Sequence, residues 1–134
     1  GYALLIAGGA VSWQSKLQAL VALSTTEAEF IAAVDAGKDV MWMRSLLREF
    51  GLEVSGASQL RIDNQSAIAV SKNPEHHGRM KHLDLRYYWL RDTVDAGHIA
   101  PSFVATKDQV ADIFTKPLAR IDLERCRPLL GLVL

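Results

Sequence analysis

The sequence has few of the features that mark a secreted or membrane protein. It contains one cysteine, Cys126, so no disulfide can form within the chain, and a reducing compartment is expected. No run of about 18 apolar residues is present, and therefore no membrane span is predicted. The N-terminus lacks the basic flank and cleavage site of a signal peptide. These absences predict an intracellular protein.

The chain also has no net charge at pH 7, because 15 Lys and Arg residues balance 15 Asp and Glu residues. Any surface that binds nucleic acid must therefore be a local basic patch. The 134 residues, 49% of them hydrophobic and 22% charged, fit one folded domain rather than a disordered tail. The chain has no initiator Met and opens directly on an apolar run at Tyr2, so we expect it to be a piece of a longer one.

One stretch places a carboxylate at the end of a short buried strand. Leu60 and Ile62 alternate with polar neighbours, as in a strand, and residues 67–70 give the following segment a helical apolar side. Asp63, between the two, stands at the carboxyl end of the strand, where α/β folds bind ligands and metals. The alternative interpretation is that Asp63 only caps the helix that follows.

A second candidate acid lies in a helix predicted to begin at residue 24. Ser24 and Glu27 have the spacing of a capping box, and Gly37 is expected to bend or break the helix. Glu29 lies two positions after Glu27, about 200° round the helix, and so cannot share the capping role. Two alanines one turn further on leave room beside its carboxylate. The alternative is that Glu29 is an ordinary solvated surface residue.

A third acid, Asp112, lies in a further predicted helix. Residues 106–109 have the form of a second capping box, which predicts a helix through residue 114. Before it, a strand is expected over residues 99–105, and Pro101 confines that strand to a sheet edge. The other expected elements are strands over 2–7 and 11–16 joined by a Gly8-Gly9 turn, a helix over 82–96 and a last helix through 123–129.

The basic residues concentrate in one segment, residues 72–91, which holds five Lys or Arg residues and three of the four histidines. This segment is a candidate contact for a phosphate backbone, with a plain solvated helix face as the alternative. His76, His77 and His82 have no cysteine nearby and lack the paired spacing of zinc ligands. A zinc site is therefore disfavoured.

Four motifs occur in order along the chain: STTEAEF at 24–30, DNQSA at 63–67, KHLDLRY at 81–87 and ADIFTKPL at 111–118. Together they resemble the ribonuclease H domain at the end of the Pol polyprotein of copia-type LTR retrotransposons. The resemblance extends from residue 1 to about residue 132. It implies an α/β fold of the ribonuclease H-like type, a mixed sheet with helices on both faces. It also implies a single domain over 1–134, whose residues 118–134 form a helical tail.

The resemblance implies hydrolysis of the RNA strand of RNA–DNA hybrids during reverse transcription, with two Mg²⁺ ions, or Mn²⁺ in their place, held by carboxylates. Glu29, Asp63 and Asp112 match the second, third and fourth acids of the family, and are expected to be catalytic and metal-binding. Gln65 matches a position that touches the minor groove, where a 2′-hydroxyl distinguishes RNA from DNA. The residues expected to bind substrate are Asn64, Gln65, Lys81, His82 and Arg86.

The implied partners are an RNA–DNA hybrid and an upstream reverse transcriptase domain of the same polyprotein, in a cytoplasmic virus-like particle or in the nucleus. The three matched carboxylates should converge at one mouth of the sheet. The first acid of the family is expected on a central strand upstream of Gly1. Without that strand, the strands at 2–7 and 60–63 should leave a gap or pair with each other.

Two departures from the family pattern lower the expected activity of the chain. The first acid is not among the 134 residues, and the loop over 103–108 has no counterpart of the product-release histidine of cellular ribonucleases H. We therefore expect weak or no cleavage by the chain alone. The alternative is a catalytically dead remnant that acts as a nucleic-acid-binding or interaction module. An integrase-like nuclease of the same fold is disfavoured by the short spacings between Glu29, Asp63 and Asp112.

Overall fold

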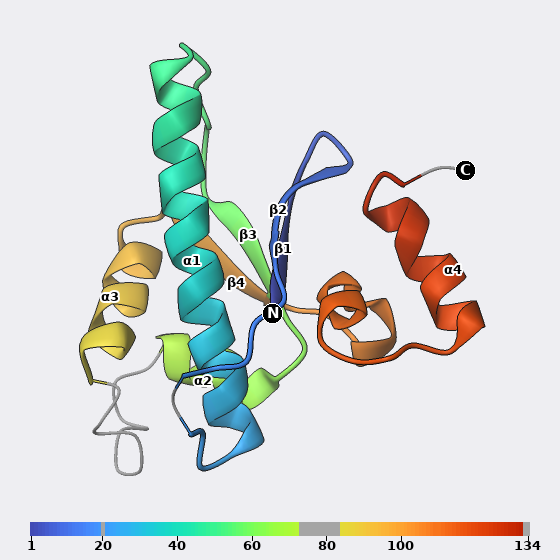
Figure 1. Cartoon of the computed structure of the whole chain (residues 1–134). Coiled ribbons are helices and arrows are strands. Elements are labelled where there is room, and N and C mark those ends of the chain that lie inside the picture. The colour runs from blue at the N-terminus through green and yellow to red at the C-terminus, as the bar shows by residue number, and fades with distance from the viewer. Residues whose placement is uncertain (20, 73–83, 133–134) are drawn as a thin grey trace. The chain divides into compact units, whose positions relative to one another are not determined.

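The computed structural model of the chain describes residues 1–19, 21–72 and 84–132. Figure 1 shows helices mixed with short strands, which confirms the predicted mixed α/β class. The chain divides into two compact units, the first made of Gly1–Val21 and Val104–Leu134 and the second of Ala22–Phe103. In the described ranges, no helix is both long enough and apolar enough to cross a membrane.

The described strands pair in two separate two-stranded sheets. In the first unit β1 (Tyr2–Ile6) pairs antiparallel with β2 (Gly9–Gln14), and in the second β3 (Ser58–Ile62) pairs in parallel with β4 (Ile99–Phe103). The one mixed sheet that the resemblance implied is therefore not among the described pairings, since β1 bonds only to β2 and β3 only to β4. Direct pairing of β1 with β3, one of the two expected outcomes, is likewise not formed by these strands.

The hairpin of the first unit turns one residue earlier than predicted. Ala7 (φ 51°) and Gly8 (φ 82°) both have positive φ and form the two-residue connection, while Gly9 is already the first residue of β2. Positive φ at both central positions is the requirement of a type I′ hairpin turn, whose twist matches that of the flanking strands. The predicted Gly8-Gly9 turn was wrong because Ala7 accepts a backbone conformation that usually favours glycine.

The helix predicted after residue 106 is replaced by two short 3₁₀ turns, η3 (Thr106–Asp108) and η4 (Val110–Phe114). Thr106 makes no capping bond; instead the Gln109 side chain accepts a hydrogen bond from the Ala111 N–H at 3.4 Å. The prediction of a second capping box was therefore wrong. Gln109 has an extended backbone (φ −76°, ψ 101°) and separates the two 3₁₀ turns, so no continuous helix forms. The last predicted helix is present as α4 (Arg120–Leu129).

The elements of the first unit are held together by contacts to β2 and to Ser15, the residue that follows the strand. The Ser15 hydroxyl donates to the Phe114 carbonyl at 2.6 Å, and the rings of Trp13 and Phe114 stack with centroids 6.4 Å apart. The Ala10 N–H donates to the Leu130 carbonyl at 2.9 Å, just beyond α4. The end of η4 is thus anchored on the strand and on the residue that follows it.

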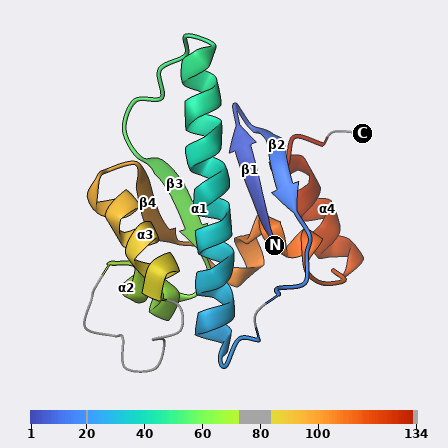
Figure 2. The ribbon, with the colours of Figure 1, turned by 60° about the vertical axis from the view of Figure 1, so that its left-hand side comes forward.

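The second unit combines the β3–β4 pair with three helices, α1 (Thr25–Glu49), α2 (Gln65–Lys72) and α3 (Asp84–Asp95). Each helix contacts at least one of the strands and both other helices. Figure 2 shows the ribbon of this unit, with α1, α2 and α3 beside the β3–β4 pair. The buried side chains come from all parts of this unit and include Phe30, Val34, Ala67, Leu90 and Ile99, none more than 1% exposed. Residues distant in sequence therefore share one core.

Helix α1 runs unbroken through Gly37, so the predicted bend or break is wrong. A Cβ added at Gly37 would lie 3.3 Å from the side chains of Ile99, Leu90 and Trp89. The glycine therefore marks the place where α3 and β4 come close to α1. The absence of a side chain at Gly37 allows α3 and β4 to pack closely against α1, and the helix continues on both sides of the glycine.

Candidate active site

Asp63 occupies the short connection between β3, which ends at Ile62, and α2, which begins at Gln65. The neighbouring Asn64 caps the helix: its side-chain oxygen accepts from the Ala67 N–H at 3.0 Å. The interpretation of Asp63 as the N-cap is therefore wrong, since Asn64 caps the helix. Asp63 is half-buried at the carboxyl end of β3, the position at which α/β folds bind ligands and metals.

Glu29 lies near the start of α1, two residues after a glutamate with a structural role. The Ser24 hydroxyl accepts from the Glu27 N–H at 3.1 Å, which confirms the predicted N-cap. The Glu27 carboxylate, in a side chain only 2% exposed, accepts from the Leu23 N–H at 2.8 Å, one residue further back than a capping box requires. Glu29 is half-buried, and is therefore not a fully solvated surface residue.

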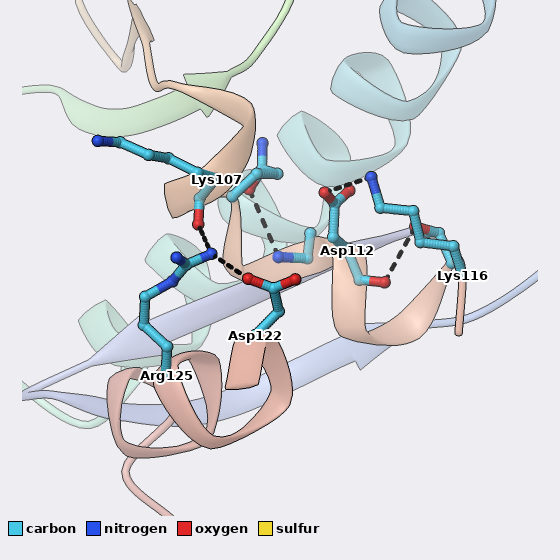
Figure 3. Close-up of polar contacts among 8 residues, drawn as sticks. Lys107, Asp112, Lys116, Asp122 and Arg125 are labelled. Atoms are coloured by element: carbon cyan, nitrogen blue, oxygen red, sulfur yellow. Dashed lines mark hydrogen bonds and ion pairs between the residues drawn. The ribbon is translucent and has the colours of Figure 1, made fainter. Parts of the chain in front are cut away.

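Asp112 lies in η4 and is paired with a lysine that the sequence analysis did not single out. The Lys116 ammonium is 2.6 Å from the Asp112 Oδ2, and the aspartate side chain is 17% exposed (Figure 3). The backbone fixes this spacing, because the Asp112 carbonyl accepts from the N–H groups of both Thr115 and Lys116 at 3.1 Å. The separation of four residues was the available signal for this pair.

The three acids are divided between the two units. Glu29 and Asp63 belong to the second unit, in which α1 contacts β3 and α2, whereas Asp112 belongs to the first. Their convergence stays a prediction. In the part of the chain that the structure describes, no group of three or more His, Cys, Asp or Glu side chains is arranged to hold a metal ion.

The chemistry of the donors fits Mg²⁺, which prefers carboxylate oxygens. At Asp63 the capping task that would otherwise occupy the carboxylate belongs to Asn64. At Asp112 the Oδ2 oxygen is in contact with the Lys116 ammonium, so an ion that binds this same oxygen has to displace that contact.

The residues expected to bind substrate have different surroundings. Gln65 is exposed at the first position of α2, beside Asp63, and Arg86 is half-buried on α3. Because the Asn64 oxygen is engaged by the cap, its amide NH₂ is the group available for donating to a substrate. Lys81 and His82, like His76 and His77, lie outside the described residues.

Comparison with known proteins found no matching family model and no similar solved structure. Curated relatives are long polyproteins. The chain is 46% identical over 132 residues to the retrovirus-related Pol polyprotein from transposon TNT 1-94 of Nicotiana tabacum, covering 98% of the chain and 10% of the relative. It is 35% identical over 133 residues to that of transposon RE2 of Arabidopsis thaliana, covering 99% and 9%.

A third relative, the Pol polyprotein from transposon RE1 of Arabidopsis thaliana, is 37% identical over 120 residues, which cover 90% of the chain and 8% of the relative. The chain thus spans about a tenth of the length of the relatives it matches. The homologues of this chain are Pol polyproteins of copia-type retrotransposons, and the chain is similar to one segment of them along nearly its whole length.

Proposed function

We propose that the chain is the ribonuclease H segment of a retrotransposon Pol polyprotein and acts on the RNA strand of RNA–DNA hybrids during reverse transcription. The observation that carries this proposal is the position of Asp63, half-buried at the carboxyl end of β3 and relieved of capping by Asn64. An acid held there by the sheet, in a chain homologous to Pol polyproteins, fits a preorganised hydrolytic site.

Glu29, Asp63 and Asp112 are the proposed ligands of Mg²⁺, with Mn²⁺ as a substitute. When bound, a pair of such ions activates a water molecule and stabilises the leaving oxygen. The role of the chain is to hold these carboxylates ready and to position the hybrid. Asp63 is well suited to this, since the end of β3 and the capped start of α2 hold its backbone on both sides.

The proposed substrate contacts lie beside Asp63. Gln65 is exposed on the first turn of α2, two positions after the acid, and its amide is the proposed contact to a minor-groove 2′-hydroxyl. Asn64, Lys81, His82 and Arg86 complete the proposed contact set. The proposed partners are the hybrid itself and a reverse transcriptase domain of the same polyprotein, within a virus-like particle or the nucleus.

A cleavage assay tests the proposal, with a hybrid labelled on its RNA strand and Mg²⁺ or Mn²⁺ in the buffer. We expect weak cleavage by the 134-residue chain. A protein extended upstream by a strand carrying the first acid should cleave faster by a hundredfold or more, since one misplaced catalytic group costs about that much in rate. Asp63→Asn in the extended protein should abolish cleavage, whereas Asp95→Asn, the same change on an exposed acid, should not.

Cleavage by the extended protein that persists in Asp63→Asn would overturn the catalytic assignment. Tight hybrid binding without any cleavage, in a protein that carries all four acids, would support the alternative of a nucleic-acid-binding module. The Asp95→Asn control separates both results from a general effect of losing one negative charge.

A further inference from the structure

We infer that Arg44 is a positioning residue: it fixes the register of α1 against β3, and with it the alignment of Glu29 with Asp63 at the other end of the second unit. The inference rests on the proposed function, in which both acids are metal ligands. All three residues lie in the continuous stretch Ala22–Phe103, which forms one compact unit.

The Arg44 side chain joins the last part of α1 to the chain that enters β3. Its guanidinium donates to the Gly56 carbonyl and the Ser58 hydroxyl, both at 3.0 Å, and to the Val54 carbonyl at 3.3 Å. Ser58 is the first residue of β3, and its N–H donates to the His98 carbonyl at 2.9 Å, directly before β4. We call Arg44 with its three acceptors the Arg44 clamp. Such a task suits the planar fork of arginine, whose donors have fixed directions.

Helix α1 and strand β3 run in opposite directions. In Figures 1 and 2 the start of α1 and the end of β3 lie at the same end of the second unit, and the connection between them lies at the other. Helix α1 is continuous over Thr25–Glu49, and β3 over Ser58–Ile62. A shift of α1 along β3 at the clamp therefore also moves the ends that carry Glu29 and Asp63 relative to each other.

The dimensions of the two elements place both acids at similar distances from the clamp. Glu29 lies 15 residues before Arg44, about 22 Å along an α-helix, and Asp63 lies five residues after Ser58, about 17 Å along a strand. Fifteen residues turn the helix by about 60° more than four full turns. Glu29 is therefore on nearly the same side of α1 as Arg44, the side that meets the chain entering β3.

Apolar packing alone specifies this register less sharply than the clamp does. The core of the unit includes Phe30 and Leu60, and the hydrophobic effect that buries them is non-directional. Hydrogen bonds, by contrast, have narrow ranges of distance and angle. Loss of the clamp should therefore allow a small shift of α1 along β3 while the core stays formed.

Double electron–electron resonance on the full chain measures this register without any assay of activity. Nitroxide labels on Lys38→Cys and Ser66→Cys, two exposed positions on α1 and α2, report the distance between α1 and the helix that follows β3. Cys126→Ala removes the native thiol. Arg44→Met should move or widen the distance distribution by about 1–2 Å, the size of small shifts between packed helices. Arg48→Met, the matched control, removes an exposed arginine one turn further along α1 and should leave the distribution unchanged.

Hybrid cleavage by the protein extended upstream provides a second measurement. Arg44→Met should lower kcat by about ten- to a hundredfold, because a misplacement of about 1 Å can cost about a hundredfold in rate. KM should stay within about twofold, since the proposed contacts to the hybrid are unaltered. Arg44→Lys keeps the charge but lacks the planar fork, and its kcat should lie between the two. Arg48→Met should change neither constant.

An unchanged distance distribution in Arg44→Met would overturn the inference, as would an equal change in Arg48→Met. If Arg44→Met does not fold, Arg44→Lys provides the same comparison. The two proposals also fail in distinguishable ways. Cleavage that survives Asp63→Asn would refute the ribonuclease assignment, and the distance measurement would still decide whether Arg44 sets the register. Cleavage that depends on Asp63 but keeps its full kcat in Arg44→Met would refute only the role of Arg44.

Discussion

At the scale of single residues, two adjacent side chains at the end of β3 divide two tasks between them. Asn64 closes the first turn of α2 through its bond to the Ala67 N–H, and Asp63 projects from the preceding position. Because the tasks are separate, the stability of α2 and the chemistry proposed for the acid should respond to different substitutions.

Asn64→Ala should lower the free energy of unfolding by about 1 kcal/mol, the usual effect of losing a helix N-cap, whereas Asn64→Asp should restore it. Asp63→Ala should change stability by less than about 0.5 kcal/mol, because it removes no capping bond. Urea unfolding followed by circular dichroism measures all three variants. A larger loss from Asp63→Ala than from Asn64→Ala would contradict this division of tasks.

At the scale of elements, the sequence predicted correctly those helices and turns whose formation depends on one short segment. Ser24 as a cap, the hairpin near residue 8 and the last helix all depend on neighbouring residues, and all are present. The failures depend on more distant partners. Gly37 looked like a helix breaker because nothing in its neighbourhood reveals Ile99 and Leu90, which it accommodates across the core.

The candidate site shows the same limit of prediction from local sequence. The resemblance supplied the positions of Glu29, Asp63 and Asp112, but neither it nor the spacing decided whether Asp63 or Asn64 would cap α2. Both residue types are good caps, so only the hydrogen bond to Ala67 decides. Lys116 was overlooked although its spacing from Asp112 was visible, because an i,i+4 pair on a solvated helix contributes little by itself.

Gly37→Val tests the close packing between α1, α3 and β4. The added methyl groups would meet side chains already 3.3 Å from the first added carbon, and such overpacking should destabilise the protein by about 1–3 kcal/mol. Lys38→Val places the same residue at the next, exposed position and should lose only about 0.5 kcal/mol through helix propensity. Thermal and urea unfolding would compare them; equal losses would show that Gly37 is not a packing position.

At the scale of the whole molecule, the hydrophobic core is unevenly distributed between the two units. Of the buried hydrophobic side chains in the described ranges, only Cys126 and Leu130 belong to the first unit. The first unit is also made of two stretches of chain, whereas the second is one continuous stretch, Ala22–Phe103. The second unit therefore has what an independently folding domain needs.

A fragment of residues 22–103 should accordingly fold by itself, with a cooperative melt in circular dichroism and dispersed methyl signals in its NMR spectrum. Phe30→Ala in this fragment removes a fully buried ring and should lower stability by about 3–5 kcal/mol, enough to unfold a domain of this size. A fragment that melts without cooperativity, or one indifferent to Phe30→Ala, would show that the core depends on the rest of the chain.

The separation of cap from acid at the end of β3 also has a consequence for how copies of such a gene decay. A copy that loses Asp63 by mutation keeps the Asn64 cap and with it the start of α2. Loss of the proposed chemistry is then invisible to the cellular machinery that removes misfolded proteins. A copy that is expressed after such a mutation should therefore still fold, so its surfaces stay open to selection after hydrolysis has been lost.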